Sequence, residues 1–472
     1  MTVSATGCLM ANVKPGKYPV SRRALLGGLG AAMLVPRWTA AASSSYSLKN
    51  ARLLIGDGTE VRGGLRVEAG LITAVGPEVT SGEDLGGAVL WPGMYNSGCD
   101  LGLVEVDQEG GTRDDADGAA VSPQVRVVDA YNPRSLAIAV SRFDGVVGAL
   151  VLPGDRLVAG QGAWLRTLGD TVDDALIQAP AGLVVRLGRG GLSGTDAPSS
   201  RMGAAAKLRE LLENAEDDDE DVGREEGWRK KRRLRSRDED EDDDEDDEED
   251  RDEDDDDHED DHEDDDAEGE AADVGAGELS PGDRVLRQVR RGRLKVLIAA
   301  DRASDLLVAL SIIDEFKLDA MLLGAAEGHL VAGAIAEAGV PVLLGPVTTQ
   351  PSSFDTLNAR YDNAALLHRA GVRLAIRAPG HHNIRNLNLD AGLAARAGLP
   401  PEVALAAITG NGPGFFGLKV GLLRPGYEGT CVLSDGDPLQ PRTAHRRVWV
   451  RGVEAPMVSY QTELRDRFRS LW

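Results

Sequence analysis

The central part of the sequence alternates apolar runs with helical stretches, and this alternation restricts the fold more than any other feature. Six short apolar runs are bounded by Gly or Pro, at residues 145–154, 181–188, 294–301, 318–324, 340–346 and 372–380. Such continuous runs are typical of parallel strands buried on both faces. Helical patterns at 304–316, 329–339 and 356–371 separate the later runs. The order predicts an α/β fold, and the count fits a (β/α)8 TIM-like barrel.

A doubly wound sheet is the rival fold. It has less support, because no GxGxxG follows the first strand and no GxxxxGK[ST] occurs in the chain. Both ends of the chain are β-rich instead, with Gly-rich turns between short alternating runs. We therefore expect one small composite β-sandwich from residues 43–90 and 424–472. The barrel would take residues 91–214 and 276–423.

Residues 1–42 have the pattern of an export signal. Arg22 and Arg23 precede a 12-residue apolar stretch, Ala24–Val35, and small residues at Ala40–Ala42 offer a cleavage site. A membrane-spanning helix needs about 20 apolar residues, so a removable signal fits better than an anchor. Ser-Arg-Arg-x-Leu-Leu resembles the bacterial twin-arginine signal. The sequence thus predicts an exported protein, periplasmic or extracellular, with no membrane span after signal removal.

A low-complexity charged insert occupies residues 215–275. Its Asp238–Glu270 part holds 28 acidic residues and one Arg, a local charge of −27 in a chain of net charge −26. The rest of the chain is therefore close to neutral, and its charge gives no reason to expect nucleic acid as a partner. The insert has too few apolar residues to fold, so we expect disorder. An inert hydrated segment, loose binding of cations (with His258 and His262 adding weak metal affinity) and docking of a basic protein all stay open.

The two ends and the first strand together resemble the amidohydrolase superfamily, and are most similar to its imidazolonepropionase-like branch. The residues that carry the resemblance are NARLLIGDGT and GLITAVGP near the start, PGMYNSGCDLG at 92–102, and GLLRPGYEGTCVLSDGDPL at 421–439. The resemblance runs from Tyr46 to Glu454. It implies a distorted barrel, a composite β-sandwich, and a hydrolase of non-peptide C–N bonds that uses Zn or another divalent metal.

The same resemblance implies where the metal ligands should be, and most of them are missing. Positions that should carry His or Asp are Gly98, Asp100, Ala299, Leu323 and Pro379. Arg186 stands where some members have a carbamylated Lys, and it stays protonated. A bound metal lowers the pKa of water to about 7, so without ligands the superfamily's mechanism fails. We therefore expect no cofactor and a catalytically degenerate barrel.

Polar residues at the strand ends could form a different site. The candidates for a pocket are Asp100, Asp301, His381 and His382, with Cys99, Glu105, Glu327 and Arg385 nearby in the pattern. A His–Asp pair could transfer protons without metal if the two groups are in contact. The simpler interpretations are that residues 380–390 form a polar loop with diverging histidines, and that Asp301 caps the next helix. Cys99 and Cys431 are expected to be small buried residues.

Two classes of function remain open at this point. One is a hydrolase with relocated chemistry, which requires Asp100, Asp301 and His381 to converge. The other is a non-catalytic exported protein that binds a small-molecule ligand or acts as a scaffold. Binding of cations at the surface through the acidic insert is a further alternative. The sequence identifies no substrate and no protein partner.

Overall fold

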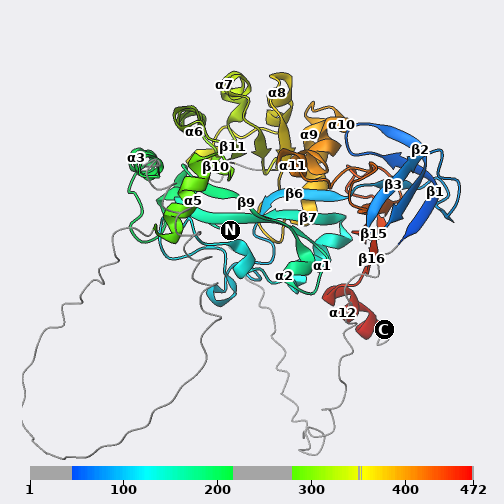
Figure 1. The fold of residues 1–472 in the computed structure, drawn as a ribbon. Coiled ribbons are helices and arrows are strands. Elements are labelled where there is room, and N and C mark those ends of the chain that lie inside the picture. Colours follow the sequence, from blue (N-terminus) through cyan, green and yellow to red (C-terminus); the bar gives the residue numbers. More distant parts are fainter. Residues whose placement is uncertain (1–44, 216–278, 349–350, 352, 470–472) are drawn as a thin grey trace, which may run out of the picture. The chain divides into compact units, whose positions relative to one another are not determined.

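A computed structural model describes residues 45–215, 279–348, 351 and 353–469 of the chain. The expected signal at 1–42 and nearly all of the charged insert lie outside these residues. Sixteen strands belong to two sheets in the described part, and each sheet contains eight of them. Figure 1 shows both sheets and the helices around them.

The first of these sheets is the predicted barrel. Its strand order follows the chain, from β6 to β13, and the eight strands are β6 (Met94–Cys99), β7 (Val146–Val151), β8 (Val158–Arg166), β9 (Leu176–Arg186), β10 (Val296–Ala300), β11 (Ala320–Gly324), β12 (Val342–Leu344) and β13 (Leu374–Ile376). The α/β barrel fold is thereby confirmed. The strand missing from the sequence analysis is β8, which runs antiparallel to both of its neighbours. Its Gly and Gln residues interrupt the apolar run, so the pattern did not reveal it.

Side chains complete the barrel between β6 and β13. Asn96, which is fully buried, donates from Nδ2 to the carbonyl of Ala378 (2.7 Å) and accepts from the Ala378 N–H (3.2 Å). Nε of Arg377 also donates to the carbonyl of Gly98 (3.0 Å). A side-chain amide has the same donor and acceptor as a peptide group, so it can stand in for a ladder contact. The ends of β6 and β13 are therefore held next to each other.

Among the described residues, the helices up to α8 lie between barrel strands in the chain order, and α9 to α12 come after β13. They are α1 (Leu136–Phe143), α2 (Val172–Ala175), α3 (Arg201–Glu213), α5 (Pro281–Arg290), α6 (Ala303–Phe316), α7 (Ala332–Ala338), α8 (Asn363–Arg369), α9 (Leu387–Arg396), α10 (Pro401–Ile408), α11 (Asn411–Phe415) and α12 (Tyr460–Arg469). Six short 3-10 helices accompany them: η1 (Gly110–Thr112), η2 (Val127–Asp129), η3 (Arg189–Leu192), η4 (Gly328–Leu330), η5 (Phe354–Thr356) and η6 (Ile384–Asn386). In the described part of the chain, no helix has the length and hydropathy needed to cross a bilayer.

The other sheet is built from both ends of the chain, as the sequence predicted. Its order is β16-β15-β14-β5-β1-β2-β3, with β4 paired to β1, and its strands are β1 (Tyr46–Leu54), β2 (Glu60–Glu68), β3 (Leu71–Gly76), β4 (Glu83–Asp84), β5 (Val89–Trp91), β14 (Cys431–Ser434), β15 (His445–Val450) and β16 (Val453–Ala455). The segment before β14 reaches the barrel through Glu428, whose carboxylate accepts from Arg166 of β8 at 2.6 and 2.9 Å. Both side chains of this pair are largely buried.

Candidate functional site

The predicted ligand positions lie side by side at the carboxyl ends of the barrel strands. Arg186, Ala299 and Leu323 are direct register partners across β9, β10 and β11. Residues in register on parallel strands point to the same face of the sheet. An added Cβ on Gly98 of β6 would lie 3.3 Å from Cδ1 of Leu323. The positions aligned by the family resemblance are therefore neighbours in space, although none of these four side chains offers a carboxylate or imidazole.

A guanidinium occupies the space beside Gly98. A Cβ added to Gly98 would lie only 2.9 Å from Nε of Arg377, and the φ angle of +148° at Gly98 is one that other residues rarely adopt. Arg377 follows β13 and is half-buried. Burial and, to a smaller extent, the nearby charge of Arg186 lower its pKa to about 10, and the charge of Asp301 opposes the shift. No described carboxylate lies within ion-pairing distance of Arg377.

Arg186 contributes a second positive charge to the same region. Its Nε and Nη2 donate to the carbonyls of Gly154 (3.0 Å) and Pro153 (2.8 Å), in the turn between β7 and β8. Its carboxylate partner, Asp155, lies 3.3 Å away and is 65% exposed, so solvent weakens this pair. We call Gly98, Arg186, Leu323 and Arg377 the guanidinium site.

Asp301 belongs to this region and does not cap the next helix. Arg302 is at the N-cap of α6 and makes no side-chain capping bond, whereas the Glu327 carboxylate accepts from the Ala303 N–H at 2.9 Å. Asp301 instead accepts from the Ala326 N–H at 3.2 Å. Burial raises the pKa of Asp301, and this hydrogen bond and the charge of Arg377 oppose the rise. The cap interpretation was wrong, because the loop after β11 supplies a better-placed carboxylate.

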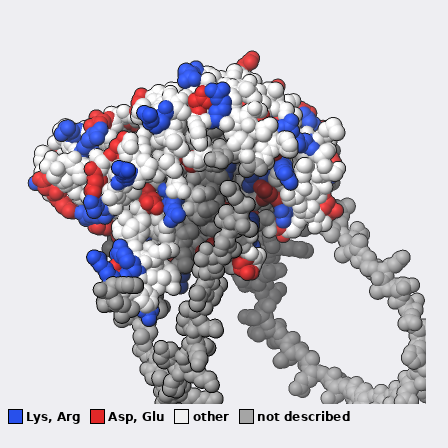
Figure 2. Space-filling model, turned by 180° about the vertical axis from the view of Figure 1, so that it is seen from behind, with Lys and Arg blue, Asp and Glu red and all other residues white. Residues whose placement is uncertain are grey.

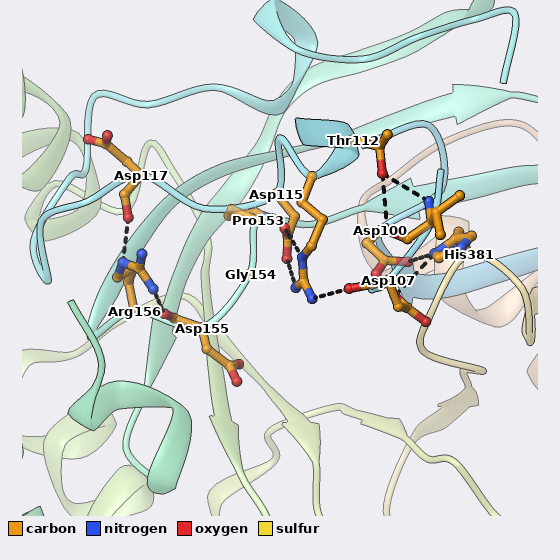
Figure 3. A network of polar contacts seen from close by, with 12 residues as sticks. Asp100, Asp107, Thr112, Asp115, Asp117, Pro153, Gly154, Asp155, Arg156 and His381 are labelled. Atoms are coloured by element: carbon orange, nitrogen blue, oxygen red, sulfur yellow. Dashed lines mark hydrogen bonds and ion pairs between the residues drawn. The ribbon is translucent and has the colours of Figure 1, made fainter. Parts of the chain in front are cut away.

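A second group of polar side chains meets where the loops after β6 and β13 come together. Nδ1 of His381 lies 3.7 Å from Oδ1 of Asp100 and 4.0 Å from Oδ1 of Asp107. Nδ1 of His382 lies 3.5 Å from Oδ2 of Asp107. Figure 3 shows His381 directed between the two carboxylates. We call Asp100, Asp107, His381 and His382 the His–Asp cluster.

The two histidines converge, contrary to the sequence argument that adjacent side chains diverge. Their rings are in edge-to-face contact, with centroids 5.1 Å apart and planes at 77°. One face of this pair is enclosed, since the His381 side chain is 7% exposed and that of His382 is 55% exposed. A polar loop does lead into η6 and α9, as expected, but its turn directs both Nδ1 atoms toward Asp107.

Asp100 and His381 carry polar atoms that lack partners. Oδ1 of Asp100 and Nδ1 of His381 are both buried and make no hydrogen bond. Burial raises the pKa of Asp100, and the charge of His381 opposes that shift. Of the three residues expected to converge, Asp100 and His381 do so, whereas Asp301 interacts with Ala326 and the arginines instead.

The sequence analysis did not single out Asp107. Its loop is fixed locally: the Val106 N–H donates to Thr112 Oγ1 (3.1 Å), and that hydroxyl donates to the Val106 carbonyl (3.0 Å). Nη1 of Arg113 also reaches the Asp107 carbonyl at 3.4 Å. The only available signal was the acidic composition of residues 100–117, which does not show which carboxylate faces β13.

The other candidates have structural partners. Glu105 accepts from Asn132 Nδ2 and Ser135 Oγ, both at 3.0 Å, which ties the loop to the start of α1. Burial raises the pKa of the Cys99 thiol to about 12, so it is a poor nucleophile at neutral pH. Cys99 and Cys431 are buried and free, as expected. Arg385 is exposed, and its charge acts on Asp144.

One cavity among the described residues lies away from these side chains. It has a volume of about 460 Å³ and is lined by residues that include His368, Arg373, Glu402 and Phe415. Leu374, the first residue of β13, also lines it. Arg377 and His381 instead come after Ile376, the last residue of β13. None of the predicted site residues borders this cavity, so it does not mark the predicted site.

Comparisons with known proteins agree on the fold. No protein-family model and no curated protein matches the chain. Among solved structures, an amidohydrolase from Thermotoga maritima is 23% identical with a TM-score of 0.69, over 87% of this chain and 99% of the other. A prolidase complexed with N-methylphosphonate-L-proline is 13% identical with a TM-score of 0.50, over 87% and 99% of the two chains. The protein has an amidohydrolase fold, and at these identities the likeness establishes the fold alone.

Proposed function

We propose that this protein belongs to the amidohydrolase superfamily, has lost the metal chemistry of that superfamily at its usual position, and binds a small anionic molecule at the barrel mouth. The observation that carries the proposal is Arg377, whose guanidinium fills the space beside Gly98 and Leu323. The imidazolonepropionase-like branch remains the best assignment on the residues that resemble it.

A divalent cation does not fit the guanidinium site. Gly98, Ala299, Leu323 and Pro379 have no side-chain donor, so Asp100 is the one potential ligand at these positions. A fixed positive charge also repels a cation by about 4 kcal/mol per unit charge at 4 Å near a protein surface. The donor set and the electrostatics therefore both favour an anion over a metal.

The same geometry suits a carboxylate or a phosphate. Arginine presents a rigid planar fork of N–H donors that binds both groups in a bidentate manner. Arg377 uses Nε for the Gly98 carbonyl and has no ion-pair partner among the described residues. Arg186 is near enough for its charge to affect the pKa of Arg377. An anion between them would relieve the repulsion of two like charges in a region where burial is unfavourable to both.

The experiment is a ligand titration of the full chain, kept free of metal with a chelator. Inorganic phosphate and a series of small carboxylates would be added while thermal unfolding is followed. We expect at least one anion class to raise the melting temperature of the wild type, and Arg377→Met to lose most of this rise. Arg377→Lys keeps the charge without the fork and should retain part of it. Arg126→Met, which removes an exposed surface arginine, is the control. Equal shifts in wild type and Arg377→Met would overturn the proposal.

A hydrolase of C–N bonds is the second candidate function, and the His–Asp cluster favours it. Asp100 and His381 face each other at the carboxyl ends of the strands, where barrel enzymes place catalytic groups. N-acyl amino acids and cyclic amides would be tested with and without added Zn²⁺. Hydrolysis that disappears in His381→Ala would replace the binding function with this one.

We also propose that the protein is exported by the twin-arginine route. The support is the order of Arg22-Arg23, the short apolar stretch and Ala40–Ala42. Residues 1–42 fused to a reporter should deliver it across the bacterial inner membrane, and Arg22→Lys combined with Arg23→Lys should stop delivery. Export that is unchanged in the double variant would contradict this route.

A further inference from the structure

Two buried polar atoms without partners face each other in the His–Asp cluster. They are Oδ1 of Asp100 and Nδ1 of His381, 3.7 Å apart. This separation is too long for a hydrogen bond, and a buried donor or acceptor that lacks a partner is unfavourable. His381 is nine-tenths buried, so bulk water does not solvate its ring. The arrangement indicates that a third body belongs between the two side chains.

We propose that Asp100, Asp107, His381 and His382 bind one divalent transition-metal ion, with Zn²⁺ as the reference ion. The three ligand atoms of Asp107, His381 and His382 all lie within 4.8 Å of one another. Oδ1 of Asp100 faces the same Nδ1 atom of His381 as Asp107 does. Four protein ligands of this kind complete a tetrahedral coordination sphere.

The distances support one shared ion. Zn–N and Zn–O bonds of about 2.0–2.1 Å place neighbouring ligands of a tetrahedral site about 3.4 Å apart. Here Nδ1 of His381 lies 3.7 Å from Asp100 and 4.0 Å from Asp107, and Nδ1 of His382 lies 3.5 Å from the other oxygen of Asp107. The ligand atoms of Asp107, His381 and His382 lie within 4.8 Å of one another, so side-chain rotations would have to bring them closer around the ion. The two carboxylates would balance the charge of the ion, and two imidazoles favour Zn²⁺, Co²⁺ or Ni²⁺ over Ca²⁺ or Mg²⁺.

This site is distinct from the one that the superfamily resemblance implies. Of the positions that the resemblance assigns to a metal, the cluster uses Asp100 alone, and its other three ligands come from loop residues beyond the ends of β6 and β13. The proposal does not rest on anion binding, because none of its ligands belongs to the guanidinium site. Arg113 is close enough for the charges of Asp100 and Asp107 to act on it, and it pairs with Asp115 through Nε and Nη2.

The alternative is an ordinary ion pair between His381 and Asp100, which needs no metal. The two interpretations predict different behaviour of Asp107, which is 44% exposed. In an ion pair of His381 with Asp100, Asp107 contributes little. In a metal site it joins both histidines, and its removal weakens binding. Asp107→Asn changes an exposed residue, so its effect is not obscured by misfolding.

The experiment is a Zn²⁺ titration of the full-length protein after removal of metal, followed by calorimetry with a competing chelator. Cobalt substitution gives a second readout, because Co²⁺ in a tetrahedral site absorbs visible light. All variants retain the acidic insert, so its loose binding of cations is common to every sample and cancels in the comparison. His381→Gln is included beside His381→Ala to preserve side-chain volume, and thermal unfolding checks that each variant folds.

We expect the wild type to bind one Zn²⁺ ion more tightly than the Zn²⁺ ions that the acidic insert binds loosely. Affinity should fall at least about 100-fold in His381→Ala and His381→Gln, and about 10- to 100-fold in Asp107→Asn and His382→Ala. His368→Ala, at the distant cavity, should bind as the wild type does. Identical isotherms in wild type, His381→Gln and Asp107→Asn would overturn the site, as would the absence of any binding beyond the loose class. Neither result affects phosphate binding measured without metal. A failure of the metal site can therefore be told apart from a failure of the proposed anion binding.

Discussion

The guanidinium site and the His–Asp cluster lie at the same strand ends, yet their polar groups differ in whether they have hydrogen-bond partners. Beside Gly98, protein groups occupy the available space, and Arg377 bonds directly to the Gly98 carbonyl. Two residues further along, Asp100 and His381 leave polar atoms unpartnered at 3.7 Å. Packing and a backbone hydrogen bond thus hold the first region together, although its guanidinium has no ion-pair partner among the described residues, whereas the second leaves polar atoms without hydrogen bonds. The difference teaches that Arg377 fills the space beside Gly98 while polar groups two residues further along remain without partners.

The face drawn in Figure 2 gives no comparable signal among the described residues. Acidic and basic side chains are interspersed on it, and neither sign gathers into a broad field. This fits a chain whose charge outside Asp238–Glu270 is close to zero. Function is therefore better sought at the strand ends than in a charged surface, and four predictions test the contrast found there.

The largest effect is expected from Gly98→Ala. The new Cβ would lie 2.9 Å from Arg377 Nε and 3.1 Å from Leu152 Cδ1, on a backbone with φ of +148°. Overpacking and backbone strain together should lower the free energy of unfolding by about 2–5 kcal/mol, measured in urea. Gly118→Ala, where nothing lies within 4 Å of the new Cβ, should change it by no more than about 0.5 kcal/mol. Similar values for both variants would show that the guanidinium site is not tightly packed.

A slightly smaller loss is expected from Asn96→Leu, whose side chain has the same branching of heavy atoms as Asn. It removes both hydrogen bonds to the backbone of Ala378 and leaves those two groups without partners in the core. At about 1–2 kcal/mol for each group, stability should fall by about 2–4 kcal/mol in the same urea experiment. The exposed Asn383→Leu is the control and should stay within about 0.5 kcal/mol. If Asn96→Leu left the free energy of unfolding unchanged, side chains would not be what holds β6 and β13 together.

The two histidines should differ in the protein without metal. His381→Ala removes a ring that is 7% exposed and should cost about 1–2 kcal/mol, whereas His382→Ala removes one that is 55% exposed and should cost about 0.5 kcal/mol or less. Chemical denaturation with a chelator present measures both. Zn²⁺ should then stabilise the wild type more than it stabilises either variant. Equal costs without metal would contradict the described burial of His381.

The smallest effect concerns Asp100 and its dependence on pH. Burial raises the pKa of this carboxyl in the folded protein. The folded state therefore binds more protons than the unfolded state between the two pKa values, and stability falls as pH rises through that window. Without metal, Asp100→Asn should be more stable than the wild type by up to about 1 kcal/mol at pH 7. The gain should shrink as the pH is lowered toward about 3.9, the ordinary Asp value. A gain that is the same at both pH values would contradict this origin.

Much of the fold was readable from the sequence because its strands are local patterns. The runs that became β7, β9, β10, β11, β12 and β13 are largely apolar, and the Gly-rich meanders at both ends became the second sheet. The antiparallel strand β8 was missed because its Gly and Gln residues break the apolar pattern. The prediction that Asp301 caps α6 was wrong, because the carboxylate of Glu327, from a different loop, accepts the hydrogen bond of the Ala303 N–H.

By itself the sequence determined the barrel, the paired ends and the absence of metal-ligating side chains at Gly98, Ala299, Leu323 and Pro379, because residue identity and periodicity act within one strand. Only the tertiary structure decided what lies beside these positions. Arg377 reaches Gly98, and His381 meets Asp100 and Asp107, because closure of the barrel brings together strand ends that are far apart in the sequence. No local sequence pattern predicts these contacts, because they depend on the register of eight strands and on the Asn96 amide that joins β13 to β6.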